Sequence, residues 1–199
     1  MIDLARPSVE VAPSLLGAVL HGRGVSVRLT EVEAYLGELD PGSHAFRGQT
    51  RRNAVMFGPA GRLYTYFTYG MHTCANIVCS PEGVASAVLL RAGEVIDGVE
   101  LARRRRTTSK RDSDLAQGPA RLCVALGITL GDDGADLENG ELRLEAGSHP
   151  VEQFATGPRT GVSGDGGTDA FPWRFWIPGD PTVSPYKPAV RRVRPAGRR

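Results

Sequence analysis

Residues Tyr64-Thr65-Tyr66-Phe67-Thr68-Tyr69 are followed directly by Gly70-Met71-His72, and this stretch says most about the fold. Its alternation predicts a β-strand with Tyr64 and Tyr66 on one face and Phe67 and Tyr69 on the other. Gly70 marks a tight turn into a second strand, so we expect a hairpin with an aromatic side chain at its tip. A flat ring on a rigid projection suits insertion between stacked bases.

Outward from this hairpin, the pattern predicts strands and helices on both sides. A helix opens at Pro7-Ser8 or Pro13-Ser14 and runs to about Leu20. Further strands are expected at residues 25–35, 84–92, 141–145 and 173–177, and further helices at residues 98–106, with Asp97 as cap, and 120–126. The strand at 84–92 is apolar on both faces and should be central. Together these elements indicate a mixed α/β (α+β) fold with a largely antiparallel sheet.

Two loops stand out between these elements. Residues 40–53 lack periodicity and carry Gly, Pro, Arg and His, and long loops in compact domains are often functional. Residues 161–167 are rich in glycine, lack the spacing of a nucleotide-binding loop, and are expected to be flexible.

Composition narrows the class of protein. A chain of 199 residues suits one domain, and its net charge is only +2. The three cysteines, Cys74, Cys79 and Cys123, lack metal-type spacing, so we expect reduced, buried thiols in a cytoplasmic protein that uses no metal. No apolar run is long enough to span a bilayer, and no signal-peptide pattern opens the chain. We therefore expect no membrane association.

Positive charge is concentrated in two segments that are rich in arginine. Arg103 to Arg106 with Lys110 and Arg111 form one, and residues 187–199 form the other. Each segment could contact phosphates through the fork of the guanidinium, or could be a solvated face in the first case and a disordered tail in the second. We divide the chain into a domain at 1–186 and a basic tail at 187–199.

Glu33 is the first candidate for chemistry. By strict alternation, the face that holds Val25, Val27 and Leu29 continues to Glu31, Glu33 and Tyr35, and so changes from apolar to acidic and aromatic. A carboxylate that is partly desolvated at this position suits a general base. The alternative is an ordinary surface carboxylate near the end of a strand.

Three further residues each have a structural and a functional interpretation. His44 lies in the long loop with Arg47, Arg51 and Arg52, where it could be structural or could lie beside a phosphate-binding site. Arg91 ends an otherwise apolar strand and needs an acceptor, which could be a structural carboxylate or a reacting group beside Glu33. Asn76 lies in a strand, where its amide either bonds within the core or faces a ligand.

Several segments together resemble the alkyladenine (3-methyladenine) DNA glycosylase family, over roughly residues 10 to 186. They are Thr30-Glu31-Val32-Glu33-Ala34-Tyr35-Leu36-Gly37, Ser43-His44-Ala45-Phe46-Arg47-Gly48, Arg52-Asn53, Met56-Phe57, 66–71, Asn76-Ile77, Val88-Leu89-Leu90-Arg91-Ala92 and Gly118-Pro119-Ala120-Arg121-Leu122-Cys123. The resemblance implies one compact domain with a curved antiparallel sheet, flanking helices and a protruding hairpin. It also implies a monofunctional enzyme that flips alkylated or deaminated purines out of duplex DNA and hydrolyses the N-glycosidic bond. Such an enzyme starts base excision repair without a cofactor or metal.

The resemblance also implies a role for each matched residue. Glu33 would activate water, with Arg91 and a main-chain carbonyl at Thr160 holding that water. Tyr35 would stack on one face of the flipped base and His44 with Tyr66 on the other, while Asn76 would sit against the purine edge. Tyr69 would fill the gap in the duplex, and Arg47, Arg52, Met71 and His72 would contact DNA.

The sequence leaves two hypotheses of different classes. One is a monomeric glycosylase that acts on double-stranded DNA in the cytoplasm, associated with the nucleoid when bound. The other is a catalytically silent module that binds DNA lesions. The presence of both Glu33 and Arg91 favours the enzyme, because a pure binding module has no need of a pair that activates water.

Overall fold

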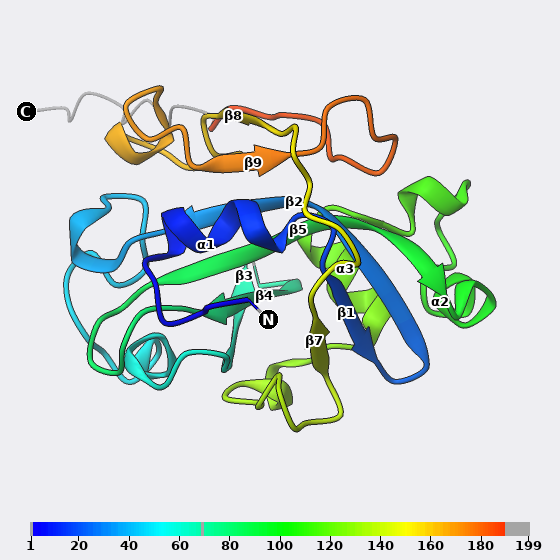
Figure 1. Ribbon diagram of the computed structural model, residues 1–199, viewed down its shortest axis with the longest axis horizontal. Helices are drawn as coiled ribbons and strands as arrows, with labels where there is room; N and C mark the ends of the chain where they lie inside the picture. Colours follow the sequence, from blue (N-terminus) through cyan, green and yellow to red (C-terminus); the bar gives the residue numbers. More distant parts are fainter. Residues whose placement is uncertain (1, 69, 190–199) are drawn as a thin grey trace, which may run out of the picture.

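The computed structural model describes residues 2–68 and 70–189 and has the expected mixed α/β architecture. One antiparallel sheet runs in the order β3-β4-β5-β2-β1-β7, with β6 paired to β5 and the β8–β9 pair attached to β2 (Figure 1). The strands are β1 (Val19–Gly22), β2 (Val25–Tyr35), β3 (Leu63–Thr68), β4 (His72–Val78), β5 (Ala87–Asp97), β6 (Ala116–Gln117), β7 (Arg143–Glu145), β8 (Ala155–Gly157) and β9 (Arg174–Trp176).

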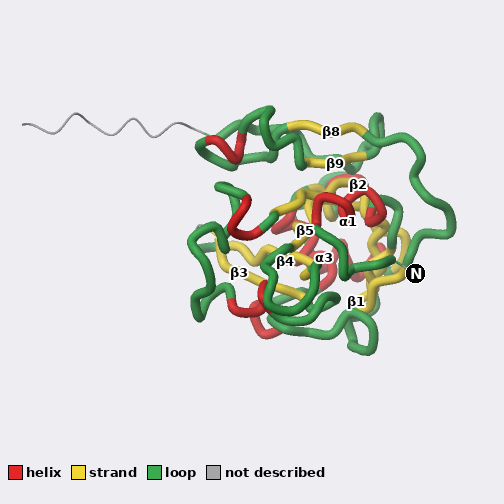
Figure 2. The backbone as a smooth tube through the Cα atoms, turned by 60° about the vertical axis from the view of Figure 1, so that its left-hand side comes forward, coloured by secondary structure: helices red, strands yellow, loops and turns green. Residues whose placement is uncertain are grey.

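Three helices pack against this sheet. They are α1 (Ser8–Leu15), α2 (Val99–Arg105) and α3 (Pro119–Leu126). Helix α1 contacts β2 and β5, whereas α3 contacts β4, β5 and β6 (Figure 2). Between sheet and helices lies one large hydrophobic core, to which Leu15, Leu90 and Leu122 contribute fully buried side chains. None of the helices in the described ranges has the length and apolar character needed to cross a membrane.

Most of the predicted elements are present. The strand predicted at 84–92 is confirmed as central because β5 pairs with both β4 and β2, but its bounds were wrong, since β5 runs from Ala87 to Asp97. Helix α3 begins with Pro119 at its first position and ends at Gly127, whose φ of +73° favours glycine. The hairpin is also confirmed, since β3 and β4 pair from Leu63 with Ile77 to Thr68 with His72.

Two predicted helix boundaries were wrong. The first helix ends at Leu15 because Leu16 is extended and Gly17 has a φ of +80°, and residues 19–22 instead pair with β2 as strand β1. Asp97 does not cap α2, since it is the last residue of β5 and Gly98 is the N-cap without a side-chain hydrogen bond.

The alternation predicted for β2 was also wrong, and the reason decides where Glu33 lies. The pairing register of β2 with β5 shifts on both sides of Glu31, which marks a β-bulge. Thr30 bonds Thr182 and its neighbour Glu31 bonds Ser184, so two consecutive side chains face the same C-terminal segment. After the bulge, Val32 and Ala34 join the core that holds Val27 and Leu29, and Glu33 and Tyr35 point to the other side.

Candidate active site

One cavity of about 1320 Å³ lies against the C-terminal half of β2 and the β3–β4 hairpin. Its walls bring together these seven residues predicted from the sequence: Glu33, Tyr35, His44, Tyr66, Asn76, Arg91 and Thr160. They come from four strands and two loops, so only the folded chain places them side by side.

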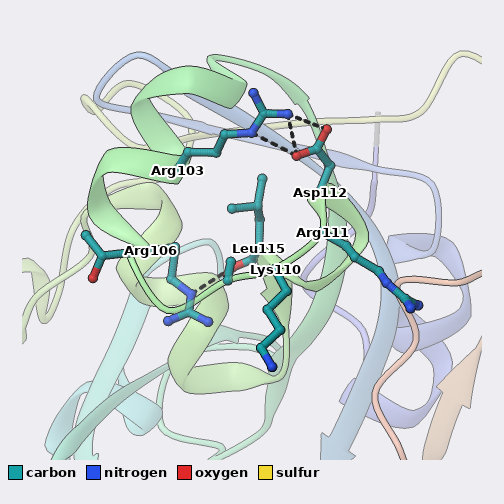
Figure 3. A pocket seen from close by; sticks show the side chains of 8 residues that line it. Arg103, Arg106, Lys110, Arg111, Asp112 and Leu115 are labelled. Carbon is teal, nitrogen blue, oxygen red and sulfur yellow. Dashed lines mark hydrogen bonds and ion pairs between the residues drawn. The ribbon is translucent and has the colours of Figure 1, made fainter.

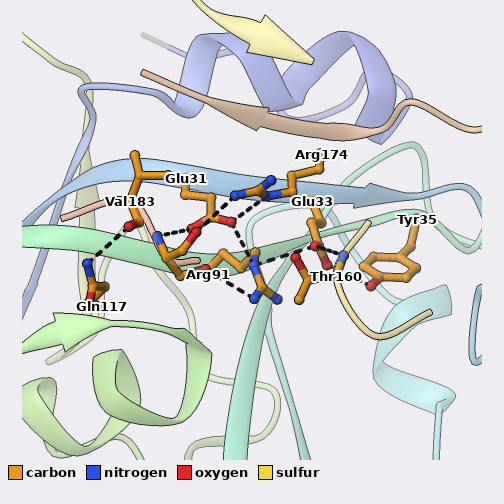
Figure 4. Close-up of polar contacts among 9 residues, drawn as sticks. Glu31, Glu33, Tyr35, Arg91, Gln117, Thr160, Arg174 and Val183 are labelled. Carbon is orange, nitrogen blue, oxygen red and sulfur yellow. Dashed lines mark hydrogen bonds and ion pairs between the residues drawn. The ribbon is translucent and has the colours of Figure 1, made fainter. Parts of the chain in front are cut away.

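Glu33 is a buried carboxylate whose two oxygens both have donors. Its Oε1 accepts a hydrogen bond from the main-chain N–H of Thr160 at 2.7 Å, and its Oε2 accepts one from the Tyr35 hydroxyl at 2.9 Å (Figure 4). The side chain is 0% exposed but lines the cavity, and Arg91 Nε lies 3.5 Å from Oε1. These donors hold the carboxylate in one orientation.

Arg91 connects Glu33 to a second buried carboxylate. Its Nε donates to Glu31 Oε1 at 2.8 Å, and one terminal nitrogen donates to the Ser184 hydroxyl at 3.2 Å. Burial acts to lower the pKa of Arg91, but the charges of Glu33 and Glu31 outweigh it, and the pKa is raised. Arg91 therefore pairs with a structural carboxylate and also lies beside Glu33, and its action on a reacting group stays a prediction.

Tyr35 forms one wall of the cavity, and the side chain of Arg159 packs against its ring. The guanidinium carbon of Arg159 lies 4.5 Å from the centroid of the Tyr35 ring. Burial and then the charge of Glu33 raise the pKa of the Tyr35 hydroxyl well above its usual value, so it stays a donor. A ring held through its hydroxyl and backed by a buried group is a rigid platform for stacking.

Arg159 itself is fully buried and has an acceptor for each of its five N–H groups. Asp40 binds both terminal nitrogens, at 2.5 and 2.6 Å, and the main-chain oxygens of Ala34 and Gly166 accept the remaining bonds. The backbone approaches so closely that a Cβ on Gly42 would lie 2.5 Å from a terminal nitrogen of Arg159. The sequence analysis did not identify Arg159 or Asp40.

A second group of aromatic rings lines the cavity at His44, Tyr64 and Tyr66. The His44 and Tyr66 rings meet edge to face at 4.5 Å, and the Tyr64 and Tyr66 rings stack at 5.8 Å. His44 is exposed as a whole residue, but desolvation of its ring beside Tyr64 and Tyr66 and then the charge of Arg52 lower its pKa, which favours the neutral imidazole. The Tyr64 hydroxyl lies 3.2 Å from Nδ1 of His44 and can donate to it in that form.

Asn76 and Thr160 take up positions that only partly match their predicted roles. The amide nitrogen of Asn76 donates to the Tyr64 main-chain oxygen at 3.1 Å, so it bonds within the core. The residue also lines the cavity, and its contact with a ligand stays a prediction. Thr160 contacts Glu33 through its N–H, whereas the predicted role concerned its carbonyl. The glycine-rich loop that follows Thr160 forms a wall of the cavity through Gly161, Val162 and Gly164.

The residues predicted to contact DNA lie outside the cavity wall. Arg47, Arg52, Met71 and His72 are all exposed on the long loop and at the hairpin turn. Tyr69, the predicted wedge, lies outside the described residues, as do positions 190–199 of the basic tail. The described start of the tail reaches the cavity, because Lys187, Pro188 and Ala189 line it.

The basic cluster of Arg103 to Arg106, Lys110 and Arg111 begins in the last turn of α2 and surrounds a separate cavity of about 460 Å³ (Figure 3). Much of its charge is already engaged, since Asp112 binds Arg103 and the Leu115 main-chain oxygen accepts from Arg106 Nε at 3.1 Å. The two cavities share none of their lining residues.

Comparison with known proteins shows which family this chain matches and which proteins it is similar to. Residues 2–181 match the family model described as "Methylpurine-DNA glycosylase (MPG)". Three similar relatives carry the name "Putative 3-methyladenine DNA glycosylase". The protein from Leifsonia xyli subsp. xyli is 64% identical over 90% of this chain and 88% of its own length. Those from Streptomyces avermitilis and Nocardia farcinica are 58% and 52% identical, over 96% and 90% of this chain and 92% and 87% of their own lengths.

Proposed function

Because this chain belongs to the methylpurine-DNA glycosylase family, we propose that it flips alkylated purines out of duplex DNA and hydrolyses their N-glycosidic bond. The observation that carries the proposal is the position of Glu33. A buried carboxylate with two fixed donors and an adjacent arginine lies in the wall of a cavity that aromatic rings line. A purine inside a duplex cannot reach a recessed carboxylate, so it must leave the stack first.

The geometry supports stacking of the extruded base between Tyr35 and the pair His44 and Tyr66. Stacking on aromatic rings contributes about 1–3 kcal/mol per base, which helps to offset the cost of unstacking. Alkylation at N3 or N7 places positive charge on the purine, and electron-rich ring faces attract such a base. A neutral His44 adds no repulsive charge beside it.

In the chemical step, Glu33 would remove a proton from water as the water oxygen bonds to C1′ of the sugar. The bond from C1′ to the purine nitrogen breaks, and its electron pair neutralises the positive charge of the alkylated ring. The products are the free base and an abasic site. A positioned general base contributes about 10²–10⁴ in rate, and Glu33 would also stabilise positive charge that develops on the sugar.

The test is single-turnover release of free base from methylated duplex DNA, compared with duplexes that contain one hypoxanthine or one 1,N6-ethenoadenine. Release of 3-methyladenine from the duplex, without release from the unmethylated duplex, is the expected result. Tight binding of every lesion with no free base in any reaction would overturn the enzymatic proposal in favour of a lesion-binding module.

A further inference from the structure

Four buried charged side chains lie together beside the cavity. Glu31 and Glu33 come from β2, Arg91 from β5 and Arg174 from β9, and each residue is at most 7% exposed (Figure 4). The function proposed above uses only Glu33 and Arg91. Two positive and two negative charges balance formally, and charges this deeply buried are tolerated only when they are paired.

Glu31 is the centre of this group. Its Oε1 accepts from Arg91 Nε at 2.8 Å and from Arg174 Nε at 2.6 Å, and its Oε2 accepts from the Ser184 N–H at 2.7 Å. Arg174 also donates to the Ser184 main-chain oxygen at 3.0 Å and lies over the Trp176 ring at 4.4 Å. Glu31 therefore has two guanidinium partners, while Glu33 shares only one of them.

The shared partner makes the two carboxylates compete. Arg91 Nε lies 2.8 Å from Glu31 Oε1 and 3.5 Å from Glu33 Oε1. Arg174 supplies the positive charge that Glu31 would otherwise take wholly from Arg91. Removal of Arg174 would leave two carboxylates with one arginine, and removal of the Glu31 charge would leave two arginines with one carboxylate.

We propose that Glu31 and Arg174 are positioning residues that act through Arg91 and set the pH range in which Glu33 serves as the base. This inference rests on the proposed function. Arg174 keeps the charge of Arg91 available to Glu33, and Glu31 holds Arg91 in place and moderates that charge. The β-bulge makes the arrangement possible, because it turns Glu31 and Glu33 away from the core face of β2 that holds Val27 and Leu29.

Other charged or titratable groups face Glu33 from the neighbouring elements and are unchanged in the test. They are Tyr35 on β2, His44 on the long loop, Tyr66 on β3, Cys74 on β4, Arg159 behind Tyr35, and Lys187 on the C-terminal segment. Burial raises the pKa of Tyr35, Tyr66 and Cys74, so these three side chains stay neutral at acid pH. The charges that differ between the variants below are therefore those of Glu31 and Arg174.

The test is the pH profile of single-turnover release of 3-methyladenine from methylated duplex DNA between pH 4 and 9. Glu31→Gln should move the acid limb of the profile down by about one pH unit, and Arg174→Gln should move it up by about as much. The double variant, whose charges balance again, should return to the wild-type limb. Arg28→Gln is the matched control, because Arg28 also lies on β2 but pairs with Glu94 and Asp180. The acid limb of the pH profile of this variant should not move.

The outcomes separate this inference from the proposed function. No release by the wild type on any lesion would remove the function itself. Release by the wild type, with variant profiles that only scale in height, would overturn the inference alone and give Glu31 and Arg174 a purely structural role. If Arg174→Gln fails to fold by circular dichroism, Arg174→Lys keeps the charge and should keep the limb, and the downward shift of Glu31→Gln still decides.

Discussion

The Tyr35 hydroxyl donates to Oε2 of Glu33 at 2.9 Å, so the ring that would stack on the base and the carboxylate that would activate water hold each other in place. Tyr35→Phe keeps the ring and removes this bond. We expect the rate of base release to fall about tenfold, ~1.4 kcal/mol, with lesion binding retained. Tyr186→Phe, at a half-exposed tyrosine outside the cavity lining, is the control. An unchanged rate for Tyr35→Phe would show that the bond does not orient Glu33.

The buried pair of Arg159 and Asp40 should show strong energetic coupling. Arg159→Met leaves the fully buried carboxylate of Asp40 without its partner and should lower the free energy of unfolding by about 3–5 kcal/mol. The double variant Asp40→Asn with Arg159→Met removes both charges and should lose much less than the sum of the two single changes. Chemical denaturation of all four proteins measures the coupling, and simple additivity would contradict it.

Gly42 is required for a steric reason. A Cβ at this position would lie 2.5 Å from a terminal nitrogen of Arg159, which is held by Asp40 and Gly166 and has no room to move. Gly42→Ala should therefore destabilise the protein by about 1–3 kcal/mol and reduce base release. Gly131→Ala, where the nearest atom lies at 3.4 Å, should leave both the melting temperature and the rate nearly unchanged.

His44 should make stability depend on pH in a defined direction. Its pKa is lowered in the folded protein, chiefly by burial, so the unfolded chain binds more protons as pH falls below about 6.5. The contribution of neutral His44 to the free energy of unfolding is complete above that pH and declines below it. Relative to His44→Asn, the wild type should lose stability between pH 7.5 and 5.5 in urea titrations. A constant difference, or a gain at low pH, would count against a neutral His44.

Local patterns predicted some of these features well. The alternation of residues 63–68 and the turn at Gly70 located the hairpin, and Pro119 and Gly127 located α3, because strand period and helix ends depend on neighbouring residues. The bulge at Glu31 was not predicted, since an inserted residue in a ladder leaves no mark on composition. The role of Arg159 was not predicted, because its partner Asp40 lies 119 residues away and its acceptors include main-chain oxygens.

Glu33→Gln shows whether Glu33 is the base that activates water. The amide keeps the size of the side chain but is a very weak base. Single-turnover release of 3-methyladenine from methylated duplex DNA should be lost, while lesion binding remains as in the wild type. Glu38→Gln, at an exposed glutamate, is the control and should release base at the wild-type rate. Release by Glu33→Gln at a rate close to wild type would contradict the account.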